Sequence, residues 1–329
     1  MLLAVSAIIV GFIILVWGAD RFIMGAAALA RNLGVAPLLI GLTIVGLGTS
    51  APEILVSAMA SFQGNPSLAI GNAIGSNIAN IGLILGVTAL VAPLMVHSDV
   101  LRREYPLLMV ISIAVFILLI DGELSRLDGV VMLGGLVATL VYVIRIGKSR
   151  ASCDPSCDPL EEEFEAEIRS DLSTFAASMW FIAGLALLLL SSRMLVWGAV
   201  QVAQAFGVSD LVIGLTIVAI GTSLPELAAS VMSALKNEHD IALGNIIGSN
   251  IYNMLAVLCV PGLVSPTLVD SDVLTRDMPL MLILTAALYV MGRSKESDGN
   301  GHIHRFEGFI LLACFIGYQG WLLTQAVTA

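Results

Sequence analysis

The sequence predicts an all-α membrane protein with ten transmembrane helices, arranged as two inverted five-helix repeats in which helices 2 and 7 are broken. Three observations lead to this fold class. The 329-residue chain is 58% hydrophobic and only 12% charged, whereas about 25% of the residues of a soluble domain are charged. Apolar stretches long enough to cross a bilayer recur along the chain, and parts of its first half reappear in its second half.

A membrane-spanning helix needs about 20 mostly apolar residues. Ten stretches meet this requirement: 2–20, 36–62, 67–92, 105–121, 127–147, 174–200, 209–235, 240–263, 278–293 and 306–325. The first stretch has no basic leader and no clear cleavage site, so we expect a retained helix and not a secretory signal. The predicted organisation is a first repeat at 1–147, an acidic cytoplasmic linker at 148–172 and a second repeat at 173–329.

An internal repeat supports this division. The block GLTIVGLGTSAPE at 41–53 returns as GLTIVAIGTSLPE at 214–226, with ten of 13 positions identical and an offset of 173. The same offset relates LAIGNAIGSNIANI at 68–81 to IALGNIIGSNIYNM at 241–254. It also relates HSDVLRREYPL at 97–107 to DSDVLTRDMPL at 270–280.

Five crossings in each half make the second repeat enter the membrane from the opposite side, as in many secondary transporters. Short cytoplasmic loops collect lysine and arginine. Twelve of the fifteen basic residues lie in the loops after segments 1, 3, 5, 7 and 9 or at the segment ends that adjoin these loops. We therefore expect both termini to face outward.

Two glutamates lie far inside apolar segments. Glu53 is about seventeen residues into its segment, and Glu226 is at the equivalent position of the second repeat. An ionised carboxylate at the centre of a membrane helix costs about 3 kcal/mol. A pairing lysine or arginine would be the ordinary explanation, but segments 2, 3, 7 and 8 contain neither. The pair therefore indicates a cation site.

The residues before each glutamate favour an opened helix. Glycine and proline occur together there, at Gly46, Gly48 and Pro52 and again at Gly221 and Pro225. Unwound backbone exposes carbonyl oxygens that can coordinate a cation. The hydroxyls that lie within one turn of the glutamates are those of Thr49, Ser50, Thr222 and Ser223. A simple helix kink would explain one group of glycine, threonine, serine and proline residues. It explains less readily why such a group occurs twice, each time beside a glutamate.

Segments 3 and 8 carry polar residues at intervals of four, which puts them on one helix face. The two stripes are Asn72, Ser76 and Asn80, and Asn245, Ser249 and Asn253. We expect them to face the broken helices as a second layer of oxygen ligands, although hydrogen bonding between helices is an alternative for the asparagines. Such oxygen ligands suit Ca²⁺ and Na⁺, whereas zinc or copper would be expected to recruit histidine or cysteine.

These paired motifs resemble the alpha repeats of the calcium:cation antiporter superfamily, which includes sodium/calcium exchangers and their bacterial relatives. The likeness rests on the two GTSxPE blocks and the two GNxxGSNxxN blocks, in order and at one offset. The resemblance implies a ten-helix fold in which Glu53 and Glu226 bind Ca²⁺ and compete for Na⁺. It also implies contributions from Thr49, Ser50, Ser76, Asn80, Thr222, Ser223 and Ser249, and from backbone oxygens at Gly46 and Ala219. Asn253 stands where some members have aspartate, so we expect two carboxylates in total and question potassium co-transport.

The predicted function is antiport of Ca²⁺ against Na⁺ by alternating access, with helices 1 and 6 moving against the other eight. A proton-coupled Ca²⁺ antiporter would use the same carboxylates, and a cation channel belongs to a different class. An enzyme is not expected, because Ser50 and Ser223 have no histidine or lysine base on any segment. We expect no cofactor and no obligate protein partner. Nucleic-acid binding is not expected either, because the net charge is −10.

Overall fold

The computed structural model describes residues 1–35, 37–97, 104–150, 172–205, 219–293 and 301–328. Most of the predicted linker at 148–172 and the start of predicted segment 7 lie outside the described residues. Helical structure covers nearly all of the described residues in the ten predicted segments.

The first half contains helices, π-helical turns (η) and two short strands. Their bounds are α1 (Leu2–Leu33), α2 (Pro37–Ile40), η1 (Gly41–Val45), α3 (Gly46–Thr49), α4 (Ala51–Phe62), α5 (Pro66–Ala79), η2 (Asn80–Leu85), α6 (Gly86–Val91), β1 (Leu94–Val96), α7 (Tyr105–Leu119), β2 (Glu123–Leu124) and α8 (Arg126–Arg150).

The described part of the second half is built from the same kinds of element. Their bounds are α10 (Thr174–Ala205), α12 (Ala219–Thr222), α13 (Leu224–Leu235), α14 (His239–Tyr252), η6 (Asn253–Val257), α15 (Cys259–Val264), β3 (Thr267–Leu268), η7 (Val273–Asp277), α16 (Met278–Gly292), β4 (Gly301–Ile303) and α17 (Arg305–Thr328).

Seven helical spans among the described residues are long and apolar enough to cross a membrane. An eighth span is bent by 48° between Gly41–Thr49 and Ala51–Phe62, and Tyr105–Leu119 and Leu224–Leu235 are shorter apolar helices. Two of the long spans form the centre of the molecule. Residues Pro66–Val91 and His239–Val264 are 72% and 89% buried over their most apolar stretch, whereas the other five long spans are 22–33% buried.

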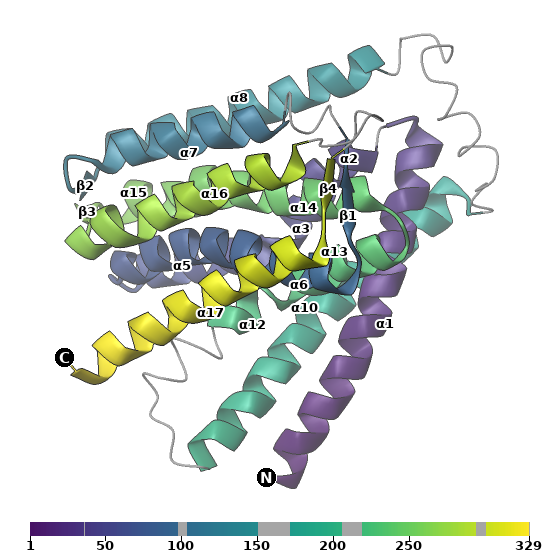
Figure 1. The fold of residues 1–329 in the computed structure, drawn as a ribbon, viewed down its shortest axis with the longest axis horizontal. Helices are drawn as coiled ribbons and strands as arrows, with labels where there is room; N and C mark the ends of the chain where they lie inside the picture. The colour runs from purple at the N-terminus through teal and green to yellow at the C-terminus, as the bar shows by residue number, and fades with distance from the viewer. Residues whose placement is uncertain (36, 98–103, 151–171, 206–218, 294–300, 329) are drawn as a thin grey trace.

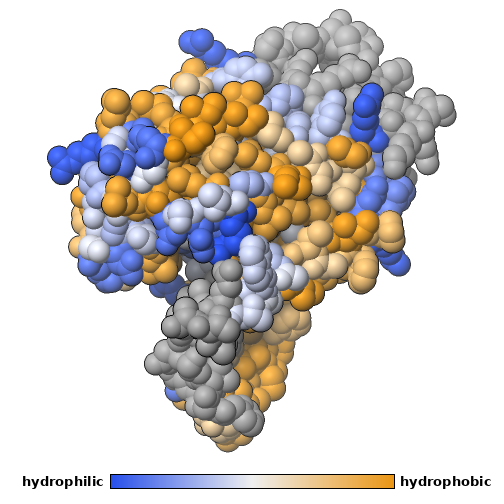
Figure 2. Space-filling view, turned by 60° about the vertical axis from the view of Figure 1, so that its left-hand side comes forward, coloured by the Kyte–Doolittle hydropathy of each residue, from blue (hydrophilic) through white to orange (hydrophobic). Residues whose placement is uncertain are grey.

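The outer helices expose large apolar side chains. Hydrophobic residues cover much of the face seen in Figure 2. Exposed apolar surface on this scale is favourable in lipid and unfavourable in water. The structure is therefore that of a multi-pass membrane protein.

Helix α1 is longer than the sequence predicted, since it continues from residue 20 to Leu33. The predicted segment ended at residue 20, where two charged residues, Asp20 and Arg21, follow one another. In the structure, Nζ of Lys236 lies 2.7 Å from Oδ1 of Asp20. The guanidinium of Arg21 lies 5.6 Å and 5.0 Å from the ring centroids of Trp17 and Trp180. Both charges have partners outside the helix backbone, so the helix passes through them.

Helices α1 and α10 form an antiparallel pair that crosses the other helices at a steep angle (Figure 1). Glycines allow the two backbones to approach. A Cβ atom at Gly25 would lie 2.5 Å from the backbone nitrogen of Phe181, and one at Gly184 would lie 2.5 Å from that of Phe22. Small residues at membrane helix interfaces permit such close contact. The aromatic rings of Phe22 and Phe181 also contact each other, with centroids 4.8 Å apart.

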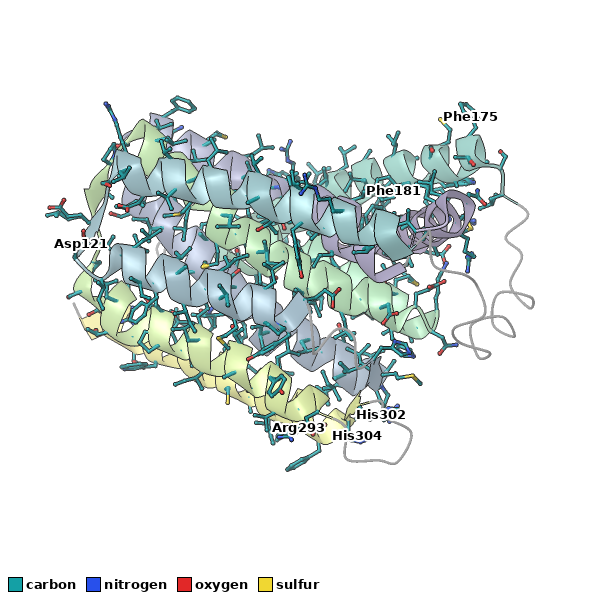
Figure 3. The ribbon with its side chains drawn as sticks, turned by 90° about the horizontal axis from the view of Figure 1, so that it is seen from above. Asp121, Phe175, Phe181, Arg293, His302 and His304 are labelled. Atoms are coloured by element: carbon teal, nitrogen blue, oxygen red, sulfur yellow. The ribbon has the colours of Figure 1, made fainter. Side chains whose placement is uncertain are left out.

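Two short strand pairs join the two halves at opposite ends of the bundle (Figure 1). Strand β1 pairs antiparallel with β4, with Leu94 opposite Ile303, and β2 pairs antiparallel with β3, with Glu123 opposite Leu268. Figure 3 shows Arg293, His302 and His304 at one end and Asp121 at the other. Each end is therefore tied by one loop from each half.

Gly184→Ala tests the close packing of α1 and α10. The added methyl group has no room beside Phe22, and overpacking of this kind typically costs about 1–3 kcal/mol. We expect a lower Tm of the detergent-solubilised protein, measured by a size-exclusion thermal-shift assay. Gly317→Ala is the matched control, because no heavy atom lies within 4 Å of a Cβ there. A Tm of the Gly184 variant equal to that of the control would contradict the packing argument.

Candidate cation-binding site

Two serines interrupt the helices that carry the glutamates. Ser50 separates α3 from α4 with φ −79° and ψ 4°, and Ser223 separates α12 from α13 with φ −90° and ψ 6°. Pro52 and Pro225 are the second residues of the helices that follow. Proline fits the first turn of a helix but cannot continue the hydrogen bonding of a preceding one. Regular helix is thus interrupted at Ser50 and at Ser223, which are equivalent positions in the two halves.

Each break places a glutamate in the first turn of a new helix. Glu53 and Glu226 are the third residues of α4 and α13, and they are 1% and 2% exposed. The N-terminus of a helix favours negative charge by about 0.3–1 kcal/mol in exposed positions and by more when partly buried. The local backbone therefore offsets part of the cost of keeping these carboxylates ionised.

The two glutamates face each other across the two halves. Their carboxyl groups are close enough to interact electrostatically. Thr49 and Ser50 from the first half approach the Glu226 carboxyl, and Ser223 from the second half approaches that of Glu53. The structure thus brings together five of the predicted site residues around one point.

Asn72 and Asn245 hold the glutamate backbones. Nδ2 of Asn72 donates to the carbonyl oxygen of Glu53 at 3.2 Å, and Nδ2 of Asn245 donates to that of Glu226 at 3.3 Å. Asn245 also donates to Oγ of Ser230 at 2.9 Å, and its Oδ1 accepts from Oγ1 of Thr49 at 3.0 Å. For these two asparagines the structure supports the alternative of hydrogen bonding between helices.

The remaining stripe residues behave differently. Ser76, Asn80, Ser249 and Asn253 are all 6% exposed or less. Asn80 and Asn253 are the first residues of the π-helical turns η2 and η6. Such turns occur frequently at functional sites. The sequence pattern identified the residues but gave no sign of the π-helical backbone.

Many oxygens of the predicted site have no hydrogen-bonding partner. Fourteen buried side-chain polar atoms in the described residues are unsatisfied, and seven belong to predicted site residues: Oγ of Ser50, Ser223 and Ser249, Oε2 of Glu53 and Glu226, and Oδ1 of Asn80 and Asn253. Each such atom costs about 1–3 kcal/mol unless something binds it. All seven are hard oxygen donors, the type that Ca²⁺ and Na⁺ prefer.

The other five predicted site residues are not among those with an unsatisfied buried side-chain atom: Thr49, Ser76 and Thr222, and also Gly46 and Ala219, which were predicted to contribute backbone oxygens. The Gly46 carbonyl accepts from the backbone nitrogen of Ser50 at 3.1 Å and from Oγ1 of Thr49 at 3.4 Å. Ala219 begins α12, and its side chain lies outside the described residues; Thr222, at the end of α12, is half-buried. Sequence reasoning missed Ser192, whose Oγ donates to the Gly221 carbonyl at 2.7 Å. In a regular helix the Gly221 carbonyl would accept a hydrogen bond from the N–H of residue 225, but Pro225 has no N–H. The sequence therefore indicated that this carbonyl needs another donor, although it did not identify Ser192.

The unsatisfied oxygens predict that Ca²⁺ stabilises the folded protein. A ligand at 100 times its Kd adds about 2.7 kcal/mol to the free energy of unfolding. We expect Ca²⁺, but not Mg²⁺ at equal concentration, to raise the Tm in detergent, because Mg²⁺ dehydrates reluctantly. Glu53→Gln and Glu226→Gln should each remove most of this shift. Glu123→Gln, at an exposed strand residue, is the control, and a full Ca²⁺ shift in both site variants would contradict the assignment.

Comparison with known proteins places the chain in a family. Residues 3–145 and 177–324 match the family described as sodium/calcium exchanger protein. The chain is 50% identical over 325 residues to a putative antiporter, CaxA, of Alkalimonas amylolytica, covering 99% of this chain and 100% of the relative. It is 42% identical over 327 residues to the inner membrane protein YrbG of Escherichia coli K12, with coverage of 99% and 100%. A solved structure of the sodium-calcium exchanger NCX_Mj has a TM-score of 0.82 at 34% identity and covers 98% of this chain and 99% of that one. The chain therefore belongs to the sodium/calcium exchanger family of membrane antiporters.

Proposed function

We propose that this chain exchanges Ca²⁺ for Na⁺ across a bacterial inner membrane by alternating access. The observation that carries the proposal is the pair of buried carboxylates, Glu53 and Glu226, each of which has one oxygen without a hydrogen-bonding partner. The family description and the similarity to NCX_Mj support Na⁺ and Ca²⁺ as the ions. The ions are substrates in this proposal, and neither a cofactor nor a partner protein is required.

The ligand set of the proposal comes from both halves. Glu53 and Glu226 supply the charge, and neutral oxygens complete the shell. The neutral ligands are the side chains of Thr49, Ser50, Ser76, Asn80, Thr222, Ser223, Ser249 and Asn253 and the backbone oxygens of Gly46 and Ala219.

The balance between the carboxylate charges and the bound ions couples Ca²⁺ transport to Na⁺ transport. One Ca²⁺ neutralises the two carboxylates, and so do two Na⁺. An empty site would hold two uncompensated buried charges, which is costly in a medium of low dielectric constant. Loaded forms therefore reorient more readily than the empty form, and the protein exchanges ions without leaking them.

The inverted ten-helix repeat is part of the same proposal. Strands β1 and β3 follow segments 3 and 8, which are equivalent in the two repeats, and each lies at a different end of the bundle. An inverted arrangement accounts for this placement. Twelve of the fifteen basic residues are in the loops of one predicted side or at the segment ends that adjoin them. We assign this side to the cytoplasm, leaving both termini outside.

The pair formed by α1 and α10 is the proposed moving unit. The two helices contact each other along most of their length and run across the remaining bundle (Figure 1). Neither carries one of the proposed ligands. Rocking or sliding of this pair would open the site to each side in turn while the ligands on the other helices stay in place.

Reconstitution in proteoliposomes tests the function directly. We expect an outward Na⁺ gradient to drive uptake of radioactive Ca²⁺, and Glu53→Gln to reduce the rate at least 100-fold because the one remaining carboxylate no longer balances Ca²⁺. The same vesicles with a pH gradient and no Na⁺ measure proton coupling.

The outcomes separate the candidate functions. Uptake driven by the pH gradient alone would replace Na⁺ with H⁺ as the coupling ion. Ca²⁺ flux without any counter-ion would indicate a channel. Full exchange in Glu53→Gln vesicles would refute the proposed site.

Crosslinking tests the moving unit. Asp20 of α1 and Lys236 at the end of α13 are joined by an ion pair of 2.7 Å. In a background without the four native cysteines, Asp20→Cys with Lys236→Cys and a short bifunctional thiol reagent should abolish exchange. Ca²⁺-dependent stabilisation should remain. Either single-cysteine variant treated with the reagent is the control, and undiminished exchange in the crosslinked protein would exclude movement of α1 against α13.

A further inference from the structure

Two buried asparagines outside the predicted ligand set lie next to it. Asn77 in α5 and Asn250 in α14 are separated by the repeat offset of 173, and both are 1% exposed. Each comes three residues before a proposed ligand, Asn80 or Asn253, and so lies about one helical turn away from it. Neither asparagine belongs to the ligands proposed above.

Asn250 controls the environment of Asn80. Nδ2 of Asn80 donates to Oδ1 of Asn250 at 3.2 Å. Nδ2 of Asn77 donates to the backbone carbonyl of Asn250 at 3.3 Å and contacts Sδ of Met281 at 3.5 Å. Asn77 thus contacts the backbone of Asn250, whereas Asn80 contacts its side chain.

The planar amide makes this bond directional. An asparagine side chain has an NH₂ donor on one side and an oxygen acceptor on the other. When the NH₂ of Asn80 points to Asn250, its Oδ1 must point away, and this oxygen is one of the unsatisfied buried atoms. We propose that Asn250 is a positioning residue, which turns the Asn80 amide so that its oxygen, and not its NH₂, faces the transported cation.

The equivalent bond is not made in the other half. Asn253 would be expected to donate to Oδ1 of Asn77, but that oxygen has no hydrogen-bonding partner. Of the two ligand amides, Asn80 is therefore held by the side chain of the equivalent asparagine in the opposite repeat, whereas Asn253 is not held by Asn77. Asn77 is the natural control for Asn250, because it has the same type, the same burial and the equivalent position without this role.

The inference rests on the proposed function, and the test uses the reconstituted full chain. We expect Asn250→Leu to raise KM for Ca²⁺ about tenfold with a smaller change in maximal rate, because a freed amide can present NH₂ to the cation. Asn77→Leu should leave KM within twofold of the wild type. Asn250→Asp keeps the acceptor oxygen and should not raise KM. Asn250→Ala repeats the test if the leucine variant does not insert.

A double-mutant cycle distinguishes positioning from a structural role. If Asn250 acts through Asn80, Asn250→Leu should change KM less than twofold in an Asn80→Ala background. A tenfold effect in both backgrounds, or no effect in either, would overturn the inference. If the wild type shows no Na⁺-driven uptake, the proposed function fails, and Ca²⁺-dependent thermal stabilisation still measures the cycle.

Discussion

The constraint on which the structure depends is the cost of two carboxylates buried in a medium of low dielectric constant. Glu53 and Glu226 are almost inaccessible and have no basic partner in the helices that carry them. The interruptions of the helices at Ser50 and Ser223 offset part of this cost. They put the first turn of a helix, with its unpaired N–H groups and positive dipole end, beside each carboxylate. An unbroken helix would place the same carboxylates against a saturated backbone.

The breaks in turn require support from the neighbouring helices. Asn72 and Asn245 bind the backbone carbonyls of the two glutamates, and Ser192 of α10 satisfies the Gly221 carbonyl. Polar side chains such as these are unfavourable in contact with lipid, so they lie inside the bundle and hydrogen-bond to protein. This explains why the two most buried spans, α5–α6 and α14–α15, are also the ones with asparagine and serine along one face. The apolar outer helices then surround this polar centre.

Much of this arrangement could be predicted because it is encoded twice. A single GTS motif before a glutamate could be explained as a simple helix kink. Two such motifs, each before a glutamate and separated by 173 residues, made a paired site the better hypothesis. The length of α1 could not be predicted, because the charge of Asp20 is compensated by Lys236, 216 positions later. The different contacts of Asn72 and Asn80 could not be predicted from the sequence either. Both lie on one helix face and both donate a hydrogen bond to protein, but Asn72 binds the Glu53 carbonyl and Asn80 binds the Asn250 side chain, a difference that depends on the neighbouring helices.

In the proposed site, the neutral ligands determine how the two charges behave. With Asn80 and Asn253 at the positions that begin η2 and η6, the amides add dipoles but no charge. A third carboxylate would leave a net charge of −1 with one Ca²⁺ or two Na⁺ bound, and reorientation of the loaded site would then cost more. With two carboxylates, Ca²⁺ and a pair of Na⁺ each bring the site to neutrality. Equal neutrality of the two loaded forms, combined with the cost of the empty form, is the physical requirement for exchange.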